Sequence, residues 1–208
     1  MAVSTTGCPP PQTPQARAYD AAYASIPNWD IGKPQPAFVR LEQAGAIRGR
    51  VLDVGCGTGE LSLYLARQGH DVLGVDFAPR AIAEAQAKAR WRRIDANFLV
   101  WDALELDELP LRFDTVVDSA MYHVLADSER DRFVAGLRSV LRPGGTYFVL
   151  CDAPSADTGF ESAGVSRSEF PERFREAEGW RVDFVLDTAF VRRWGQNPAF
   201  LAVITRVS

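Results

Sequence analysis

The chain has 208 residues, of which 47% are hydrophobic, and a formal net charge of -4. This length and composition suffice for one sizeable core, so we expect one domain with additions rather than two domains. The negative balance offers no basic field to a phosphate backbone, which disfavours nucleic acid as a partner. No apolar run approaches the ~18 residues of a membrane helix, and the N-terminus lacks a secretory pattern. We therefore expect a soluble, cytoplasmic protein with no membrane partner.

The cysteines and histidines give no sign of a metal or disulfide site. Cys8, Cys56 and Cys151 are odd in number, far apart and without a Cys-x-x-Cys pair. Neither a disulfide framework nor a zinc site is therefore predicted. His70 and His123, the two histidines of the chain, share no metal-ligand spacing. We expect no metal in the functional site.

Composition and periodicity divide the chain into an N-terminal tail and one domain. Residues 1–15 are rich in Pro, Thr and Ser, which predicts a flexible tail. A single domain, residues 16–208, is expected to follow. Its first part, residues 16–48, carries two helical patterns, and Pro34 and Pro36 suit the approach to the second of them. This part is predicted to form a helical cap.

Residues 49–152 alternate short apolar runs with amphipathic segments, as a core of strands and helices does. The apolar runs predict five buried parallel strands: Arg50–Val54, Asp71–Val75, Asn97–Trp101, Asp114–Asp118 and Thr146–Cys151. The amphipathic segments predict three helices: Glu60–Gln68, Ala78–Arg90 and Asp127–Leu141. This alternation indicates an α/β, Rossmann-like, doubly wound sheet with helices on both faces.

The C-terminal part, residues 153–208, breaks the alternation. Two strand patterns, Trp180–Val191 and Ala199–Val207, flank the segment RRWGQNP and predict an antiparallel hairpin at the sheet edge. The small, polar stretch Ala153–Phe170 is long for a connection and is a candidate lid over the site. Within it, Ser166–Glu169 has a capping-box pattern that predicts the start of a helix running to about residue 178.

The segment VLDVGCGTGE, Val51–Glu60, follows a strand and opens a helix. Its glycines allow a tight turn and close approach of a ligand. A dinucleotide fingerprint has its third small residue one position later, where this chain has Glu60. Asp53 and Glu60 would also repel a pyrophosphate at the helix N-terminus. The loop therefore favours a cofactor with positive charges, such as the sulfonium and ammonium of S-adenosylmethionine.

Acids also follow the next two predicted strands. Asp76 lies about 20 residues beyond the loop, where an acid accepts hydrogen bonds from ribose hydroxyls. Phe77 beside it is placed to pack on an adenine ring. Asp102 is placed to accept a hydrogen bond from the adenine amino group, with Ala103 close to the ring. The alternative for both acids is a structural helix cap.

Taken in order, DVGCGTG at Asp53–Gly59, Asp76, Asp102-Ala103 and LRPGG at Leu141–Gly145 resemble the class I methyltransferases that use S-adenosylmethionine. The similarity covers residues 50–152. It implies a seven-stranded sheet with its last strand antiparallel. It also implies S-adenosyl-L-methionine as the cofactor and S-adenosyl-L-homocysteine as the product.

A second resemblance concerns Tyr19–Leu41, which is similar to the segment that precedes the core in small-molecule methyltransferases of the thiopurine, thiol/halide and heterocycle type. These have an aromatic-rich stretch followed by W-D-x-G-x-P. The resemblance implies that Tyr23 and Trp29 line the cofactor near its sulfonium, which an aromatic face attracts. The full set of expected cofactor-binding residues is Tyr23, Trp29, Asp53, Gly55, Cys56, Gly57, Gly59, Asp76, Phe77, Asp102, Ala103 and Ser119.

The stretch DSAMYHVL follows the fourth predicted strand, where class I enzymes place residues that face the transferred methyl group. His123 in this stretch is a candidate general base, because its unperturbed pKa lies near neutral. A hydrogen-bonded wall of the pocket is an equal alternative for it. Tyr122 and Trp194 are further candidates for substrate contact. Trp194 lies with Arg192 and Arg193 in the hairpin turn, which either covers a substrate or is simply solvated.

These observations predict a methyltransferase that moves a methyl group to an S, N, O or halide nucleophile of a small molecule by in-line displacement. One alternative is a noncatalytic S-adenosylmethionine-binding protein. Another is a nicotinamide-dependent oxidoreductase, which the glycine spacing disfavours. Methylation of nucleobases or amides is disfavoured because Asp118–Met121 reads DSAM rather than the D/N-P-P-Y/F of such enzymes. No pattern in the chain indicates an oligomeric state.

Overall fold

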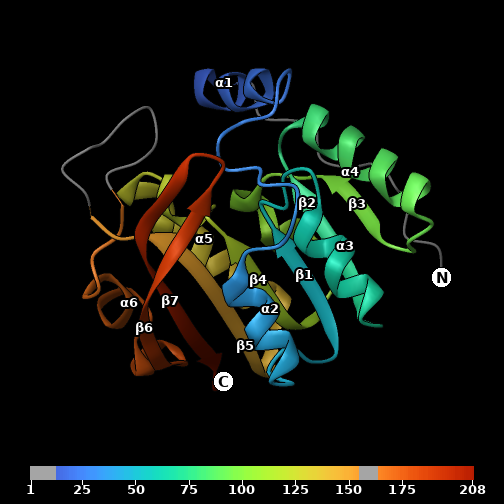
Figure 1. Ribbon diagram of the computed structural model, residues 1–208. Helices are drawn as coiled ribbons and strands as arrows, with labels where there is room; N and C mark the ends of the chain where they lie inside the picture. Colours follow the sequence, from blue (N-terminus) through green and yellow to red (C-terminus); the bar gives the residue numbers. More distant parts are fainter. Residues whose placement is uncertain (1–12, 155–163) are drawn as a thin grey trace.

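A central seven-stranded sheet organises the protein in a computed structural model that describes residues 13–154 and 164–208 (Figure 1). The strand order is β3-β2-β1-β4-β5-β7-β6. Strands β3, β2, β1, β4 and β5 are mutually parallel, whereas β7 runs antiparallel to both β5 and β6. This topology confirms the predicted Rossmann-like α/β fold with an antiparallel C-terminal hairpin.

The elements follow the predicted alternation closely. The strands are β1 (Arg50–Val54), β2 (Asp71–Asp76), β3 (Asn97–Val100), β4 (Phe113–Ser119), β5 (Leu141–Asp152), β6 (Trp180–Arg192) and β7 (Gly195–Arg206). The α-helices are α1 (Pro14–Ala22), α2 (Pro36–Gln43), α3 (Glu60–Arg67), α4 (Pro79–Arg92), α5 (Asp127–Val140) and α6 (Glu169–Arg173). Short 3-10 helices are η1 (Ala103–Glu108), η2 (Tyr122–Val124) and η3 (Glu176–Glu178).

Alternation along the buried strands builds a hydrophobic core on each face of the sheet. Leu52 of β1 belongs to the cluster that contains Phe133 of α5. The next residue along the strand toward the N-terminus, Val51, belongs to the cluster that contains Phe38 of α2 and Leu65 of α3. All five side chains are fully buried, and burial of each such side chain is worth about 1.5–3 kcal/mol. The sheet is therefore fixed between two helical layers.

The helical cap begins earlier than the sequence suggested. Thr13 precedes α1, and its hydroxyl accepts a hydrogen bond from the Ala16 N–H at 3.1 Å. Pro14 occupies the first helical position, where a missing N–H needs no partner. The predicted tail is therefore wrong for residues 13–15. The rest of that prediction, residues 1–12, lies outside the described residues.

Two connections, one before and one after the main length of β5, also depart from the predictions. Strands β6 and β7 pair as far as Arg192 with Gly195, so the turn is two residues long rather than the segment RRWGQNP. The LRPGG segment lies between a predicted helix and a predicted strand, but in the structure it is part of β5, where the pairing with β4 is irregular. Of the candidate lid, residues 155–163 lie outside the described residues.

The predicted capping box at Ser166–Glu169 is wrong. Helix α6 begins at Glu169 after Ser168, whose side chain makes no capping hydrogen bond, and the helix ends at Arg173. The Glu169 carboxylate instead accepts hydrogen bonds from the Tyr122 hydroxyl at 3.0 Å and from Arg173 at 2.7 Å. A hydrogen bond from the distant Tyr122 therefore takes the place of the local capping bond that was expected of Glu169.

The described residues, 13–154 and 164–208, contain neither a membrane-spanning helix nor a metal-binding cluster. No helix there combines the length and apolar character needed to cross a membrane. In the same residues, no cluster of three or more His, Cys, Asp or Glu side chains has a geometry suited to a metal ion.

Candidate functional site

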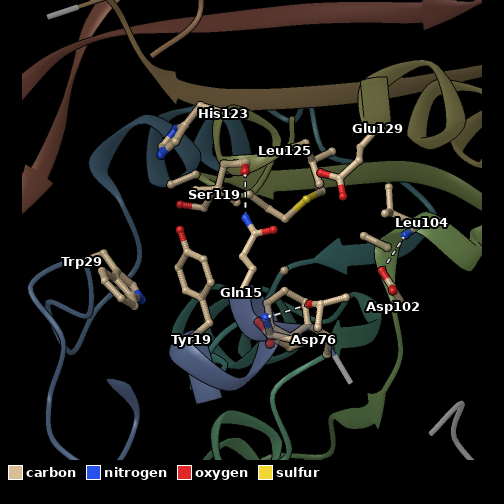
Figure 2. A pocket seen from close by; sticks show the side chains of 18 of the residues that line it. Gln15, Tyr19, Trp29, Asp76, Asp102, Leu104, Ser119, His123, Leu125 and Glu129 are labelled. Atoms are coloured by element: carbon tan, nitrogen blue, oxygen red, sulfur yellow. Dashed lines mark hydrogen bonds between the residues drawn. The ribbon is translucent and has the colours of Figure 1, made fainter. Parts of the chain in front are cut away.

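Two adjoining pockets open where the parallel strands end. The first pocket extends from Asp76 and Asp102 to His123 and Arg192. The glycine-loop pocket extends from Trp29 along the loop after β1. In Figure 2, Asp102 lies on one side of the first pocket, whereas Trp29 and His123 lie on the other. Residues that line both pockets are Tyr23, Trp29, Gly55, Ser119 and Phe190.

The loop after β1 depends on three glycines with left-handed backbone conformations. Gly55, Gly57 and Gly59 have φ values of 68°, 53° and 82°. A Cβ at Gly55 would lie 2.5 Å from the Met121 Cβ, and a Cβ at Gly57 would lie 3.0 Å from the Tyr23 hydroxyl. Glycine therefore removes both backbone strain and steric conflict, and it keeps the loop backbone open to the pockets.

Asp76 at the end of β2 is 8% exposed and lines the first pocket. One carboxylate oxygen accepts a hydrogen bond from the Gly57 N–H and the other from the Ala78 N–H, each at 2.9 Å. Burial raises the pKa of Asp76 to about 6, although these two N–H groups act in the opposite direction. Each oxygen retains a second lone pair, so the carboxylate has capacity for ligand hydroxyl groups.

Asp102, after β3, has a structural role as well as a place in the pocket wall. Its side chain caps η1 by accepting the Leu104 N–H at 2.9 Å. Burial raises the pKa of Asp102, with this N–H acting in the opposite direction. Phe77 and Ala103 line the same part of the first pocket. The cap uses one carboxylate oxygen, and the second remains for a ligand.

Asp53 of β1 and Cys56 of the loop that follows it line the glycine-loop pocket. Asp53 is 1% exposed and accepts a hydrogen bond from the Ser62 hydroxyl at 2.6 Å. Burial raises the pKa of Asp53 to about 7, the nearby Asp118 adds to the rise, and the Ser62 hydrogen bond opposes it. Burial also raises the pKa of the Cys56 thiol well above its usual value, so this thiol stays protonated.

The helical cap contributes aromatic side chains to both pockets. The Trp29 indole N–H donates to the Tyr23 hydroxyl at 3.2 Å, and the two rings meet edge to face. Tyr19 packs against Trp29 at 5.7 Å between centroids and against Phe77 at 6.0 Å. These rings form a contiguous aromatic wall, and aromatic faces attract cations.

The segment after Trp29 is anchored to the glycine loop by a polar network. The Thr58 hydroxyl donates to Asp30 at 2.6 Å, and Lys88 of α4 donates to Thr58 at 2.7 Å. Glu60 pairs with Lys88 at 2.9 Å and with both terminal nitrogens of Arg92 at 2.8 Å. Since two cations neutralise Glu60, its predicted repulsion of a pyrophosphate does not hold.

Helix α1 lies across the carboxyl ends of the parallel strands (Figure 1). Three of its residues, Gln15, Ala16 and Tyr19, line the first pocket. The Gln15 amide donates to the Val124 carbonyl at 3.2 Å, a link visible in Figure 2. At the other end of the helix, Asp20 accepts the Arg80 N–H at 2.9 Å and pairs with its guanidinium. Sequence reasoning missed Gln15 because it assigned this residue to the tail.

The turn after β4 leads to His123, which lines the first pocket on the side opposite Asp102. Buried Asp118 accepts the Met121 N–H at 2.8 Å and the Tyr122 N–H at 3.1 Å. Ala120 has a φ of 77°, a strained value for a residue other than glycine. The hydrogen bonds of Asp118 hold this backbone in place. Ser119, at the end of β4, lines both pockets.

His123 follows in η2 and is 3% exposed. Its Nδ1 accepts the backbone N–H of Asp152 at 3.1 Å. The Asp152 carboxylate pairs with the buried guanidinium of Arg192 and accepts from Asn197 at 3.1 Å. Arg192 lines the first pocket with His123, so the alternative of a solvated turn is wrong for this arginine. Its partner Asp152 lies 40 residues earlier in the chain, so no local sequence pattern indicated that Arg192 would be buried.

Two expected substrate contacts are not in the pockets. Tyr122 is fully buried, and its ring packs against Phe133, Phe170 and Phe174 in the core. Trp194 is 81% exposed at the tip of the hairpin and lines neither pocket. The structure thus corrects both assignments: one side chain points inward from its backbone and the other extends into solvent.

The pocket chemistry fits the S-adenosylmethionine that the sequence resemblance implies. Asp76 and Asp102 offer carboxylate oxygens at one end, suited to hydroxyl and amino donors. A Cβ at Gly57 would fill space beside Tyr23, so the glycine leaves room along the loop. Tyr23 and Trp29 present aromatic surface where the two pockets meet, which suits a sulfonium.

Comparison with known proteins agrees with this geometry. The profile of a family described as "Methyltransferase domain" matches residues 51–145. A 2-heptyl-1-hydroxyquinolin-4(1H)-one methyltransferase of Mycobacteroides abscessus is 37% identical over 61% of this chain. The alignment covers 56% of that relative, so the chain matches little more than half of its length.

Solved structures extend the similarity to nearly the whole chain. One, from work on the conversion of a disulfide bond into a thioacetal group during echinomycin biosynthesis, is 32% identical with a TM-score of 0.81. The match covers 91% of this chain and 92% of that one. A 1,6-didemethyltoxoflavin-N1-methyltransferase of Burkholderia thailandensis, solved with S-adenosylhomocysteine, shares the fold at 20% identity, a TM-score of 0.67 and coverage of 96% and 92%.

The fold and the site together define a Rossmann-like, nucleoside-binding α/β protein. The chain belongs to the methyltransferases: a methyltransferase of Schizosaccharomyces pombe is 32% identical over 53% of this chain and 77% of that relative. The pockets fit S-adenosylmethionine as its cofactor, and the fold is that of methyltransferases solved with S-adenosylhomocysteine. Its relatives by sequence include enzymes that act on small molecules.

Proposed function

We propose that this protein transfers a methyl group from S-adenosylmethionine to an oxygen, sulfur or nitrogen nucleophile of a small aromatic or heteroaromatic molecule. One observation carries the proposal: a single pocket joins the Asp76 end to a second end, where apolar side chains lie beside His123 and Arg192. That second end contains Trp29, Met121, His123 and Phe190. The Mycobacteroides relative is named for a hydroxyquinolone, an acceptor of this kind.

Five residues of the site would hold the cofactor. Asp76 and Asp102 would hold the ribose and adenine of the cofactor, and the loop at Gly57 would pass alongside its methionine part. Tyr23 and Trp29 would face the sulfonium. When bound, the cofactor supplies an activated methyl group, so the chain contributes alignment and exclusion of water. The tethered α1 suits the exclusion of water because three of its residues line the first pocket.

The test is methyl transfer from labelled S-adenosylmethionine to a panel of N-hydroxyquinolones, phenols, thiols, iodide and aromatic N-heterocycles. Asp76→Ala is the matched control, because it removes the carboxylate from the Asp76 end without touching the His123 end. Turnover on an N-hydroxyquinolone, a phenol, an aromatic thiol or an N-heterocycle that disappears in the control supports the proposal, whereas turnover on iodide alone would contradict the proposed acceptor class. Binding of S-adenosylhomocysteine without turnover on any acceptor would contradict it and favour a noncatalytic role.

Stabilisation by ligands separates the cofactor classes independently of the acceptor. A ligand that binds only the folded state raises the apparent stability, by about 2.7 kcal/mol at one hundred times its Kd. We expect S-adenosylhomocysteine to raise the melting temperature and NADH to leave it unchanged. The reverse pattern would indicate a nicotinamide cofactor.

A further inference from the structure

The hydrogen bond to His123 fixes which ring nitrogen carries the proton. A backbone N–H can only donate, so the His123 Nδ1 that receives it from Asp152 must present a lone pair. A neutral imidazole has one N–H, which is then on Nε2. Within residues 13–154 and 164–208, no protein group is hydrogen-bonded to Nε2. The ring therefore offers a donor, and no lone pair, to a molecule in the first pocket that it lines.

The surroundings of His123 keep the ring neutral. The charged groups that face it come from three elements: Asp152 of β5, Arg192 of β6 and Arg130 of α5. Burial is the main cause that lowers the pKa of His123 to about 4, Asp152 opposes this, and the two arginines reinforce it. The Asp152 carboxylate is itself paired with Arg192 and Asn197. Proton uptake by His123 is thus disfavoured at neutral pH.

From this geometry we propose that His123 binds the reacting atom of the acceptor as a hydrogen-bond donor, through Nε2–H, and does not act as a general base. The proposal rests on the proposed function and narrows its substrate class. The acceptor is a molecule whose nucleophilic O–H or S–H ionises in water near neutral pH, such as an N-hydroxy heterocycle, an acidic phenol or a thiol. It enters as the anion, which His123 stabilises beside the guanidinium of Arg192.

The reaction balances without a proton acceptor in the site. The acceptor releases its proton to solvent before it binds. A lone pair on its oxygen or sulfur forms the new bond to the methyl carbon, and the carbon–sulfonium bond breaks with its electron pair left on sulfur. The negative charge of the acceptor and the positive charge of the sulfonium disappear together. His123 keeps its Nε2 proton throughout and neither gains nor loses one.

The first test reads the tautomer directly and does not depend on activity. The chain has two histidines, His70 and His123, so long-range proton–nitrogen NMR of the ligand-free protein resolves both rings. The spectrum of His123→Gln assigns the signals. We expect His123 as the Nε2–H tautomer, unchanged between pH 6 and 8. A proton on Nδ1, or titration near the ordinary value of 6.5, would overturn the proposal.

The second test uses a matched pair of variants at position 123. His123→Gln places an amide donor near the position of Nε2, whereas His123→Asn keeps an acceptor near Nδ1 and lacks that donor. We expect kcat/KM to fall about 10- to 100-fold in His123→Asn, the effect of one hydrogen bond to a charged group, and to be largely retained in His123→Gln. Equal losses in both variants would contradict a donor role.

The pH dependence of the wild-type enzyme completes the test. With acceptors of different acidity, the rise of kcat/KM with pH should follow the pKa of each acceptor. A rise at one fixed pH for all acceptors would identify an enzyme base and overturn the proposal. If the wild type turns over no acceptor while NMR still shows the Nε2–H tautomer, the proposed function fails and the tautomer assignment stands.

Discussion

Replacement of Gly55 by alanine tests how the glycine loop is fitted against the turn that carries His123. Gly55 has a φ of 68°, and an added Cβ would lie 2.5 Å from Cβ and 2.6 Å from Cγ of Met121. These are inner atoms of the Met121 side chain, so rotation of its flexible end cannot remove the conflict. Gly45→Ala is the matched control, because Gly45 has a φ of 66° and nothing within 4 Å of the added Cβ.

The two variants share one cost and differ in another. A left-handed conformation costs alanine about 1–2 kcal/mol relative to glycine at either position. Overpacking against Met121 adds about 1–3 kcal/mol at position 55 only. We therefore expect Gly55→Ala to lose roughly 2–5 kcal/mol of unfolding free energy and Gly45→Ala roughly 1–2 kcal/mol. Any entropic gain from restricting the unfolded chain applies equally to both.

Urea unfolding of the ligand-free proteins measures this difference. A second measurement, the rise in melting temperature with S-adenosylhomocysteine, should show weaker binding for Gly55→Ala alone, because Met121 lines the first pocket and must shift. Equal destabilisation of the two variants would refute the reasoning, since it would show that the loop and the turn relax independently. Unchanged ligand binding in Gly55→Ala would refute the link to the pocket.

Three other changes give distinct outcomes. Asp76→Ala should weaken S-adenosylhomocysteine binding at least about 100-fold in calorimetry, because the two ribose hydroxyls lose their hydrogen bonds to a charged carboxylate. A change below tenfold would exclude Asp76 as the ribose ligand. Gln15→Ala removes the tether to the Val124 carbonyl and should speed ligand dissociation several-fold in stopped-flow while costing under about 1 kcal/mol of stability. Asp53 has a folded pKa of about 7 against an ordinary 3.8, so its stabilising contribution is complete below pH 4 and lost as pH rises through 7. Asp53→Asn keeps an acceptor for Ser62 and should gain stability over the wild type by about 1.4 kcal/mol per pH unit between pH 5 and 7; a constant difference in urea unfolding across this range would contradict the raised pKa.

Local patterns in the sequence determined the framework of the molecule. Runs such as Arg50–Val54 and helices such as Asp127–Val140 follow from periodicity and are found almost residue for residue. The DVGCGTG loop and Asp76 also lie along the pockets, because a strand, a turn and a helix in succession place their junction at the carboxyl edge of the sheet. Each of these features depends on residues close together in the chain.

Tertiary structure decided what local patterns leave open, which is where a side chain points and which distant group it meets. Tyr122 and His123 are neighbours in η2, yet packing turns the first into the core and leaves the second lining the pocket. The partner of Arg192 is Asp152, on a different strand, and the partner of Gln15 is a carbonyl 109 residues away. Such contacts form only when the sheet has assembled. The sequence alone therefore predicted the fold and the cofactor class, whereas the donor role proposed for His123 depends on contacts of the assembled site.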